Sequence, residues 1–306
     1  MAVQRILSIV LTAHNCEAYL DNTLSSLVNS LIGFTEGYEI ILINDASIDS
    51  TAELLQQFAD SHSDTHLFQV DFTNIGKVRN FGVQQCSGDY ITMIDGDDLI
   101  LPHALAEIMG YLANTRPDLL LTHLHEIHDD DYQDIGWSGL RPIRLSPHQA
   151  VKKFLIHKDF QAHFIGQFIK RELLLAYPFP DFCCYEDAYL FPTILSNSQK
   201  IIFSRRGHYL YLKRNNSLSN QINEQNISLL IEATTAMDDA FGAQYANLIA
   251  CHWINILLRY GRNIQTLRAR QKVTERVKSI RTLAFLLDPT IRLSFKRKFL
   301  KVRHGK

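Results

Sequence analysis

The amino-terminal third of the chain alternates short apolar runs with helical patterns of apolar residues. Residues 6–11, 38–43, 67–70 and 90–94 are apolar runs rich in β-forming residues, and residues 17–31 carry apolar side chains at helical spacing. Runs of this length without a polar face indicate strands buried on both sides. Because a helical pattern follows each strand, we predict a mostly parallel sheet flanked by helices, which is the α/β fold class.

The pattern continues less regularly beyond residue 100. It predicts helices at residues 102–114 and 188–195 and strands at residues 117–127, 200–203 and 208–212. From residue 226 onward the apolar spacing is helical throughout. The last part of this region, residues 262–306, interleaves cations with apolar residues. We therefore expect a helical, basic carboxyl-terminal extension.

Length and composition narrow the class of protein. A chain of 306 residues with 46% hydrophobic content can bury one large core or two modest ones. The five cysteines are odd in number and lack C-x-x-C spacing, which indicates reduced thiols in a cytosolic protein. The apolar run at residues 6–13 is too short for a signal peptide, and no run approaches the ~18 apolar residues of a membrane span.

The near-neutral net charge of −1 hides a strong asymmetry. Residues 259–306 hold 15 Lys and Arg against 2 acids, a net charge of +13, while residues 1–258 carry a net charge of −14. A basic amphipathic tail suits an anionic membrane surface, at about 1 kcal/mol per cation. Docking on the acidic half of the chain or on a second protomer remains an alternative. No nucleic-acid-reading motif accompanies the tail, so we expect no nucleic acid partner.

Polar residues follow each predicted strand of the first half. They are Thr12, Asn15, Asp45, Asn74, Lys77, Arg79, Asp95 and Asp97. In open α/β sheets ligands bind beyond the carboxyl ends of the strands. Some of these residues could cap helices instead, but their recurrence along one edge favours a ligand site. The absence of G-x-G-x-x-G and of G-x-x-x-x-G-K-[ST] disfavours a dinucleotide or P-loop site.

The fourth strand ends in an acidic cluster around a glycine. Asp95, Asp97 and Asp98 surround Gly96, which can bend the backbone so that Asp95 and Asp97 turn toward one point. Mg²⁺ and Mn²⁺ take one or two protein carboxylates together with substrate phosphates. The alternative is an acidic turn that caps the following helix.

These motifs, in this order, resemble those of family 2 glycosyltransferases, the inverting, nucleotide-sugar-dependent enzymes of the GT-A fold. The matching segments are residues 7–15, 43–51, 74–82, 94–98, 185–187 and 211–219. The resemblance covers about residues 5–220. Where the family often has Pro, Tyr, Gly and Ala, this chain has Thr12, His14, Ala46 and Val78.

The resemblance implies a nucleotide-sugar site. Asp45 would accept a hydrogen bond from the base, and the nucleoside would be lined by Thr12, Ala13, His14, Asn15 and Glu17. The base, ribose or diphosphate would be faced by Asn74, Lys77 and Arg79, with Arg214 as a second phosphate clamp. Asp95 and Gly96 would contact the ribose or the metal, and Asp97 would hold Mn²⁺ or Mg²⁺ against the diphosphate.

A second acidic motif, Tyr185-Glu186-Asp187, would supply the catalytic base. An inverting transfer needs a carboxylate that takes the proton of the acceptor hydroxyl. The motif position implies Asp187 for this role, with Glu186 supporting it or binding acceptor. The alternative is a helix amino terminus with acidic residues in its first turn, where the helix dipole favours negative charge.

The cluster between His123 and Asp131 contains possible metal ligands, but a solvated loop or acceptor rim fits its polar context better.

The resemblance implies a metal-dependent, inverting transfer of a hexose or N-acetylhexosamine to a glycan or lipid-linked acceptor in bacterial polysaccharide or lipopolysaccharide synthesis. It favours a UDP-sugar as the donor. It divides the chain into residues 1–220, with a nucleotide-binding half (1–100) and an acceptor-binding half (101–220), and the helical region 221–306. We expect a protein on the inner face of the cytoplasmic membrane, able to form homo-oligomers. The alternatives are a catalytically silent membrane scaffold and a sugar nucleotidyltransferase.

Overall fold

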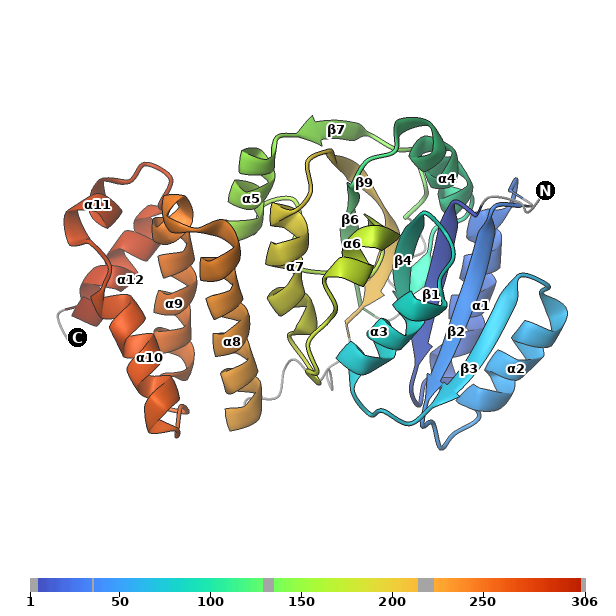
Figure 1. The fold of residues 1–306 in the computed structure, drawn as a ribbon, viewed down its shortest axis with the longest axis horizontal. Helices are drawn as coiled ribbons and strands as arrows, with labels where there is room; N and C mark the ends of the chain where they lie inside the picture. The colour runs from blue at the N-terminus through green and yellow to red at the C-terminus, as the bar shows by residue number, and fades with distance from the viewer. Residues whose placement is uncertain (1–4, 35, 129–134, 214–222, 304–306) are drawn as a thin grey trace.

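The first half of the chain forms the parallel part of a single sheet (Figure 1). The computed structural model describes residues 5–34, 36–128, 135–213 and 223–303. Strands β1 (Leu7–Ala13), β2 (Tyr38–Asp45), β3 (Thr65–Val70) and β4 (Tyr90–Asp95) lie parallel in the order β3-β2-β1-β4. Helices α1 (Glu17–Leu31), α2 (Thr51–Ser61) and α3 (Ile75–Gln85) connect them. The predicted α/β class is confirmed.

One expectation about these strands is wrong. The strand predicted at residues 67–70 was expected to be buried on both sides, but β3 is partly exposed along its length. It lies at the edge of the sheet and pairs with β2 alone among the described strands. An edge strand has a neighbour on one side and therefore leaves more of its surface to solvent.

The second half adds strands of both directions to the same sheet. β8 (Phe168–Lys170) pairs antiparallel with β4 and with β6 (Leu119–Ile127), and β6 pairs parallel with β9 (Ile201–Leu212). The short strands β5 (Leu99–Ile100) and β7 (Pro142–Leu145) pair antiparallel with β9. The helices of this half are α4 (Ala104–Thr115), α5 (Pro147–Leu155), α6 (Arg171–Ala176) and α7 (Glu186–Ser196).

The two strands predicted at residues 200–203 and 208–212 are one strand, β9, which is a second correction. The apolar pattern breaks because Arg205 and Arg206 are exposed in the middle of β9. The pairing of β9 with β6 shifts register between Thr122 and Leu124. Gly207 permits this irregularity, since a Cβ there would lie 2.0 Å from the carbonyl oxygen of His123.

A helical region completes the chain and packs on α7 (Figure 1). It consists of α8 (Glu224–Phe241), a 3₁₀ turn (Ala243–Tyr245), α9 (Ala246–Tyr260), α10 (Leu267–Lys278), α11 (Thr282–Leu287) and α12 (Leu293–Arg303). One buried core runs from the sheet into these helices, and the rings of Phe154 and Phe241 lie 5.8 Å apart across the junction. The described helices all fall short of the length or the apolar composition that crossing a membrane requires.

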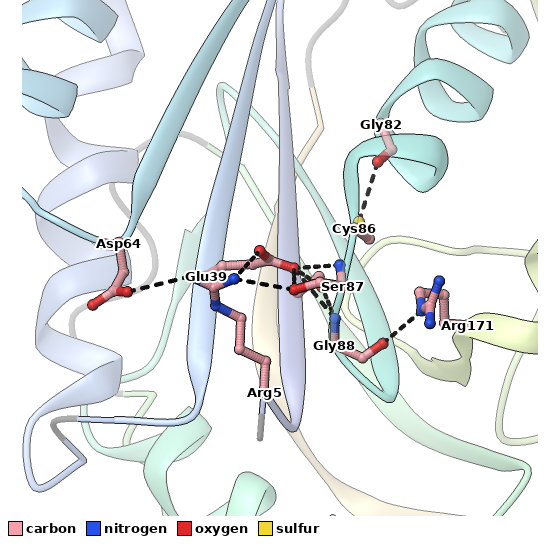
Figure 2. Close-up of polar contacts among 9 residues, drawn as sticks. Arg5, Glu39, Asp64, Gly82, Cys86, Ser87, Gly88 and Arg171 are labelled. Carbon is pink, nitrogen blue, oxygen red and sulfur yellow. Dashed lines mark hydrogen bonds and ion pairs between the residues drawn. The ribbon is translucent and has the colours of Figure 1, made fainter. Parts of the chain in front are cut away.

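A buried carboxylate ties the sheet together at the amino-terminal ends of its strands (Figure 2). Glu39 of β2 is 2% exposed, and its Oε1 accepts hydrogen bonds from the Ser8 hydroxyl at 2.6 Å and the Ser87 amide at 2.5 Å. The Gly88 amide donates to the same oxygen at 3.2 Å, and Arg5 lies 3.4 Å from Oε2. Burial alone would raise the pKa of Glu39, but these hydrogen bonds and the charge of Arg5 lower it.

We predict that Glu39→Ala lowers the free energy of unfolding by about 1–3 kcal/mol, because buried donors lose their acceptor. Folding lowers the pKa of this carboxyl, so its contribution to the stability of the folded state is complete at pH values above its pKa in the unfolded chain. The contribution is lost as the pH falls through its pKa in the folded state. The deficit of the variant should therefore be constant near neutral pH and shrink in acid. Urea unfolding from neutral to acidic pH measures it, with Glu232→Ala on the exposed side of α8 as control. An equal deficit at all pH values would contradict this role.

Candidate active site

The carboxyl ends of β1, β2 and β4 face a cavity of about 940 Å³. Most of the residues predicted for the nucleotide, the metal and the base line it: Thr12, Ala13, His14, Asp45, Asn74, Arg79, Asp95, Gly96, Asp97, Glu186 and Asp187. Arg214 lies outside the described residues. The opposite wall comes from the end of α5 and from α8 and α9, which the sequence did not associate with the site.

The three carboxylates at the end of β4 point in two directions, toward the cavity and into the core. Asp95 and Asp97 line the cavity, and the Thr12 hydroxyl donates to Asp95 Oδ1 at 3.2 Å. Gly96 lies between them because a Cβ there would come within 2.7 Å of the Cys16 sulfur. Asp98 points away into the core, where it accepts hydrogen bonds from the Tyr209 hydroxyl at 2.7 Å and the Leu212 amide at 2.8 Å. Burial and the neighbouring Asp95 raise the pKa of Asp98.

The donor atoms at this end fit a divalent cation shared with a substrate. Two carboxylates line the cavity, Asp95 at the end of β4 and Asp97 in the turn that follows it. Within the described ranges no group of three or more His, Cys, Asp or Glu side chains is placed to hold a metal by itself. Mg²⁺ and Mn²⁺ use such a sparse protein donor set when phosphate oxygens complete the coordination.

The loops after β1 and β2 form the next part of the cavity. Asp45 is 7% exposed, and its Oδ1 accepts hydrogen bonds from the amides of Phe72 at 2.7 Å and Thr73 at 3.1 Å. His14 Nδ1 lies 2.5 Å from the Asp45 carbonyl oxygen, so this ring is fixed against β2. Ala46 has φ of 52°, a left-handed conformation that favours glycine. This backbone accounts for the glycine that the family usually has there.

Three predicted residues lie outside the cavity lining, contrary to expectation. Asn15 and Glu17 hold the loop after β2 instead, since Asn15 Oδ1 accepts from the Ile48 amide and Glu17 Oε2 from the Ser50 amide, each at 2.8 Å. Lys77 points toward Asp181, with Nζ 3.6 Å from Oδ2. Asn74 both lines the cavity and caps α3, because its side chain accepts from the Lys77 amide at 3.1 Å. The capping alternative therefore holds for Asn74 as well.

Arg79 differs most from its predicted role. It was expected to face the base, ribose or diphosphate, but it is 3% exposed and its guanidinium lies among three carboxylates. Its Nη1 donates to Glu186 at 2.6 Å and also to Asp187, and its Nη2 lies 3.6 Å from Asp95. Burial opposes the charge of Arg79, but these three acids raise its pKa above the ordinary value. Arg79 therefore connects the acidic motif of β4 with that of α7.

The two acids at the start of α7 have different environments. Asp187 is held by Arg79 on one oxygen, and its Oδ2 accepts from the Phe164 amide at 3.2 Å. Burial and the charge of Asp187 raise the pKa of Glu186 to about 8, although the charge of Arg79 opposes this shift. Both acids lie in the first turn of α7, where a helix favours negative charge, and both line the cavity. The two acids thus differ in their hydrogen-bond partners and in burial, with side-chain exposures of 9% for Glu186 and 16% for Asp187.

Several other residues of the cavity lining were not predicted from the sequence. His163 precedes Phe164, and burial lowers its pKa, which keeps its ring neutral at physiological pH. Arg259 and Tyr260 come from the end of α9. No short motif marks these residues, because their position depends on how α9 packs against α7 and α8. Tyr185, in contrast, belongs to the acidic motif and could have been included.

An open α/β sheet with a large acidic cavity at the carboxyl ends of its strands defines a ligand-binding α/β protein. The family model "Glycosyl transferase family 2" matches residues 8–175, which is more than half of the chain, and the chain belongs to this family. The resemblance stated from the motifs is thereby confirmed.

Curated relatives are bacterial glycosyltransferases. Glycosyltransferase GlyA of Streptococcus pneumoniae is 24% identical over 247 residues, covering 76% of this chain and 34% of that protein. An uncharacterized glycosyltransferase of Haemophilus influenzae is 24% identical over 203 residues, covering 66% and 76%. The minor teichoic acid biosynthesis protein GgaB of Bacillus subtilis is 23% identical over 225 residues, covering 69% and 23%. The chain thus spans about a third of GlyA and a quarter of GgaB.

Solved structures confirm the GT-A fold. S. aureus TarS 1–349 in complex with UDP-GlcNAc aligns with a TM-score of 0.69 at 16% identity, covering 98% of this chain and 92% of that one. The mannosyltransferase PcManGT from Pyrobaculum calidifontis, in complex with GDP-Man and Mn²⁺, aligns with a TM-score of 0.58 at 12% identity, covering 99% and 81%. The helical carboxyl-terminal region is included in both alignments, since almost the whole chain is covered.

Proposed function

We propose that this chain is a metal-dependent inverting glycosyltransferase that transfers one sugar from a nucleotide-diphosphate sugar to a glycan or lipid-linked acceptor in the synthesis of a bacterial surface polysaccharide. The observation that carries the proposal is the cavity itself, where Asp95 and Asp97 lie on one side and Asp187 on another, with Arg79 between them. Family membership and relatives that serve teichoic acid synthesis support the class of reaction. The TarS complexes favour a UDP-sugar, with a hexose or N-acetylhexosamine as the moiety transferred.

The donor would lie along the carboxyl edge of the sheet. Asp45 and the loop from Thr12 to His14 would bind the nucleoside, and the diphosphate would extend toward Asp95 and Asp97. Asp97, with Asp95, would hold Mn²⁺ or Mg²⁺, which neutralises charge on the leaving diphosphate when it is bound. Arg79 would fix Asp95 and Asp187 relative to each other rather than contact the phosphates, because it is already enclosed by acids.

Asp187 would act as the base. As the acceptor oxygen attacks C1 of the sugar, its proton passes to Asp187, and a new bond forms between that oxygen and C1. The bond from C1 to the diphosphate breaks, and its electron pair leaves with the nucleoside diphosphate. Attack opposite the leaving group inverts the configuration at C1. The contacts from Arg79 and the Phe164 amide orient the Asp187 carboxylate for this step.

The acceptor would enter from the helical side of the cavity. This wall contains Met237 of α8, Ile256 and Arg259 of α9, and the aromatic rings of Tyr185 and Tyr260. Arg259 is exposed, and no hydrogen bond or ion pair joins it to another residue of the described ranges. Aromatic and apolar side chains with one available cation suit a sugar carried on a phosphate. We therefore propose that the glycosyltransferase domain ends at residue 220. The acceptor would be bound both by residues 101–220 and by the helical region that follows.

Thermal unfolding with a panel of UDP-, GDP-, dTDP- and CMP-sugars, with and without Mn²⁺, tests the donor site. A ligand at ~100 times its Kd adds ~2.7 kcal/mol, which shifts Tm by several degrees. We expect one nucleotide class to stabilise the protein when metal is present, and Asp97→Ala to lose most of that shift. Asp21→Ala, an exposed acid of α1, is the control. No shift with any donor, or an unchanged shift in Asp97→Ala, would contradict the proposed site.

A further inference from the structure

Helices α10, α11 and α12 each carry at least one exposed leucine that does not pack in the core. Leu267, Leu283, Leu287, Leu293 and Leu300 are between 38% and 80% exposed. The same helices are already anchored in the core through other side chains, which are Val273, Val277, Phe285 and Phe299. The leucines therefore do not serve the folding of this region.

Helix α12 separates its two faces clearly. Phe295, Phe299 and Val302, spaced by four and three residues, pack on the core. Leu293, Arg297, Leu300 and Lys301 follow the same spacing on another face, and all four are exposed. In α11 the exposed Leu283 and Leu287 lie one turn apart, on either side of the buried Phe285 in sequence. On α12, leucines and cations thus share one exposed face.

The charge of this surface is largely unpaired within the chain. Residues 259–306 carry a net charge of +13. In the described part of the chain, one ion pair joins a cation of α10–α12 to an acid, between Arg276 and Asp238 at 3.6 Å. The region packs on α9 through apolar side chains instead. The docking of the tail on the acidic half of the chain, left open by the sequence, therefore does not account for its charge.

We propose that the outward surface of α10–α12 binds an anionic lipid bilayer. The exposed leucines would enter the boundary between headgroups and acyl chains, and the Lys and Arg side chains would lie against headgroup phosphates. Nucleic acid would use the cations but gain little from leucines at the contact. Because α9 also supplies Arg259 and Tyr260 to the cavity, this attachment would hold the cavity near a lipid-linked acceptor; that consequence alone rests on the proposed function.

Co-sedimentation of the full chain with vesicles tests the proposal. We expect binding to phosphatidylglycerol-containing vesicles, much weaker binding to pure phosphatidylcholine, and release by salt. Leu283→Gln/Leu287→Gln/Leu293→Gln/Leu300→Gln should weaken binding to anionic vesicles at least ~10-fold, because apolar insertion is lost. Arg297→Gln/Lys301→Gln should weaken binding by roughly 10-fold or more, because two cations that attract the anionic headgroups are removed. Ile32→Gln/Leu175→Gln, at positions that are 51% and 49% exposed and lie outside α10–α12, should bind as wild type.

The outcomes separate this proposal from the proposed function. Each variant is first compared with wild type by circular dichroism and by its nucleotide-sugar melting shift, which should be unchanged because no substituted residue lines the cavity. Absence of wild-type binding to anionic vesicles would overturn the membrane proposal even if the nucleotide shift is present. Full retention of binding in the leucine variant, or equal losses in the control variant, would overturn it as well. Vesicle binding without a nucleotide shift would leave the membrane surface standing and contradict the enzyme.

Discussion

Replacing Asp187 with asparagine is expected to lower glycosyl transfer by about 10²–10⁴-fold while nucleotide-sugar binding is retained. Asparagine keeps the size of the side chain, and its single carbonyl oxygen can still accept a hydrogen bond from Arg79, whereas its NH2 group cannot accept from the Phe164 amide. It cannot take the proton of the acceptor hydroxyl. The measurements are the turnover number with saturating donor and, in parallel, the melting shift caused by the same donor.

Glu186→Gln provides the matched comparison. Burial raises the pKa of Glu186 to about 8, and glutamine keeps the size and the hydrogen-bonding groups of its protonated form. We expect this variant to lose much less activity than Asp187→Asn, by about tenfold at most, because a charged base is not removed. If Asp187→Asn keeps near-normal turnover, or if Glu186→Gln is the more damaging change, Asp187 is not the base.

Replacing Arg79 with methionine is expected to lower the free energy of unfolding by about 3–5 kcal/mol and to abolish most of the activity. Methionine fills the space of the arginine stem, but three acids, Asp95, Glu186 and Asp187, then face one another without a cation. Their mutual repulsion would raise the pKa of the cluster in the folded variant. Groups with a raised pKa stabilise the folded state less as the pH rises. The stability deficit should therefore be largest at neutral and alkaline pH and shrink in acid.

Urea unfolding of wild type and Arg79→Met across this pH range measures the effect. The control is Arg205→Met, since Arg205 is an exposed arginine of β9 and its loss should be nearly neutral. A deficit of less than about 1 kcal/mol at neutral pH, or one that grows in acid, would contradict the role assigned to Arg79. If Arg79→Met kept both its activity and its stability, Asp95 and Asp187 would not need the guanidinium of Arg79.

The fold followed from the sequence where the signal was local. Four buried apolar runs separated by helical patterns specify the parallel half of the sheet, and the helix at residues 17–31 was predicted with its observed bounds. The error at β9 arose because Arg205 and Arg206 interrupt the apolar run, although the backbone continues past them in a register-shifted pairing. The pattern of apolar and polar side chains indicates which residues are buried. Exposed residues in the middle of a strand therefore give the same pattern as a loop.

The site could be predicted from the sequence only in part. Whether a polar side chain faces the ligand depends on contacts with residues that are far away in the sequence. Motif position placed Asp95, Asp97 and Asp187 at one cavity, as the structure has them. It could not show that Arg79 would be enclosed by acids 107 and 108 residues away. Nor could it show that Asn15 and Glu17 hold a neighbouring loop. The wall formed by α8 and α9 depends on tertiary packing, which no local pattern encodes.

The stereochemistry of donor cleavage shows whether this protein is an inverting glycosyltransferase. Without acceptor, water can take its place, and the released sugar can be followed by NMR before its anomers interconvert. With the α-linked donor that stabilises the protein and with Mn²⁺, we expect release of the nucleoside diphosphate and a sugar that appears first as the β anomer, with both products strongly reduced in Asp187→Asn. First appearance of the α anomer, or donor binding without any nucleotide release by the wild type, would contradict an inverting glycosyltransferase.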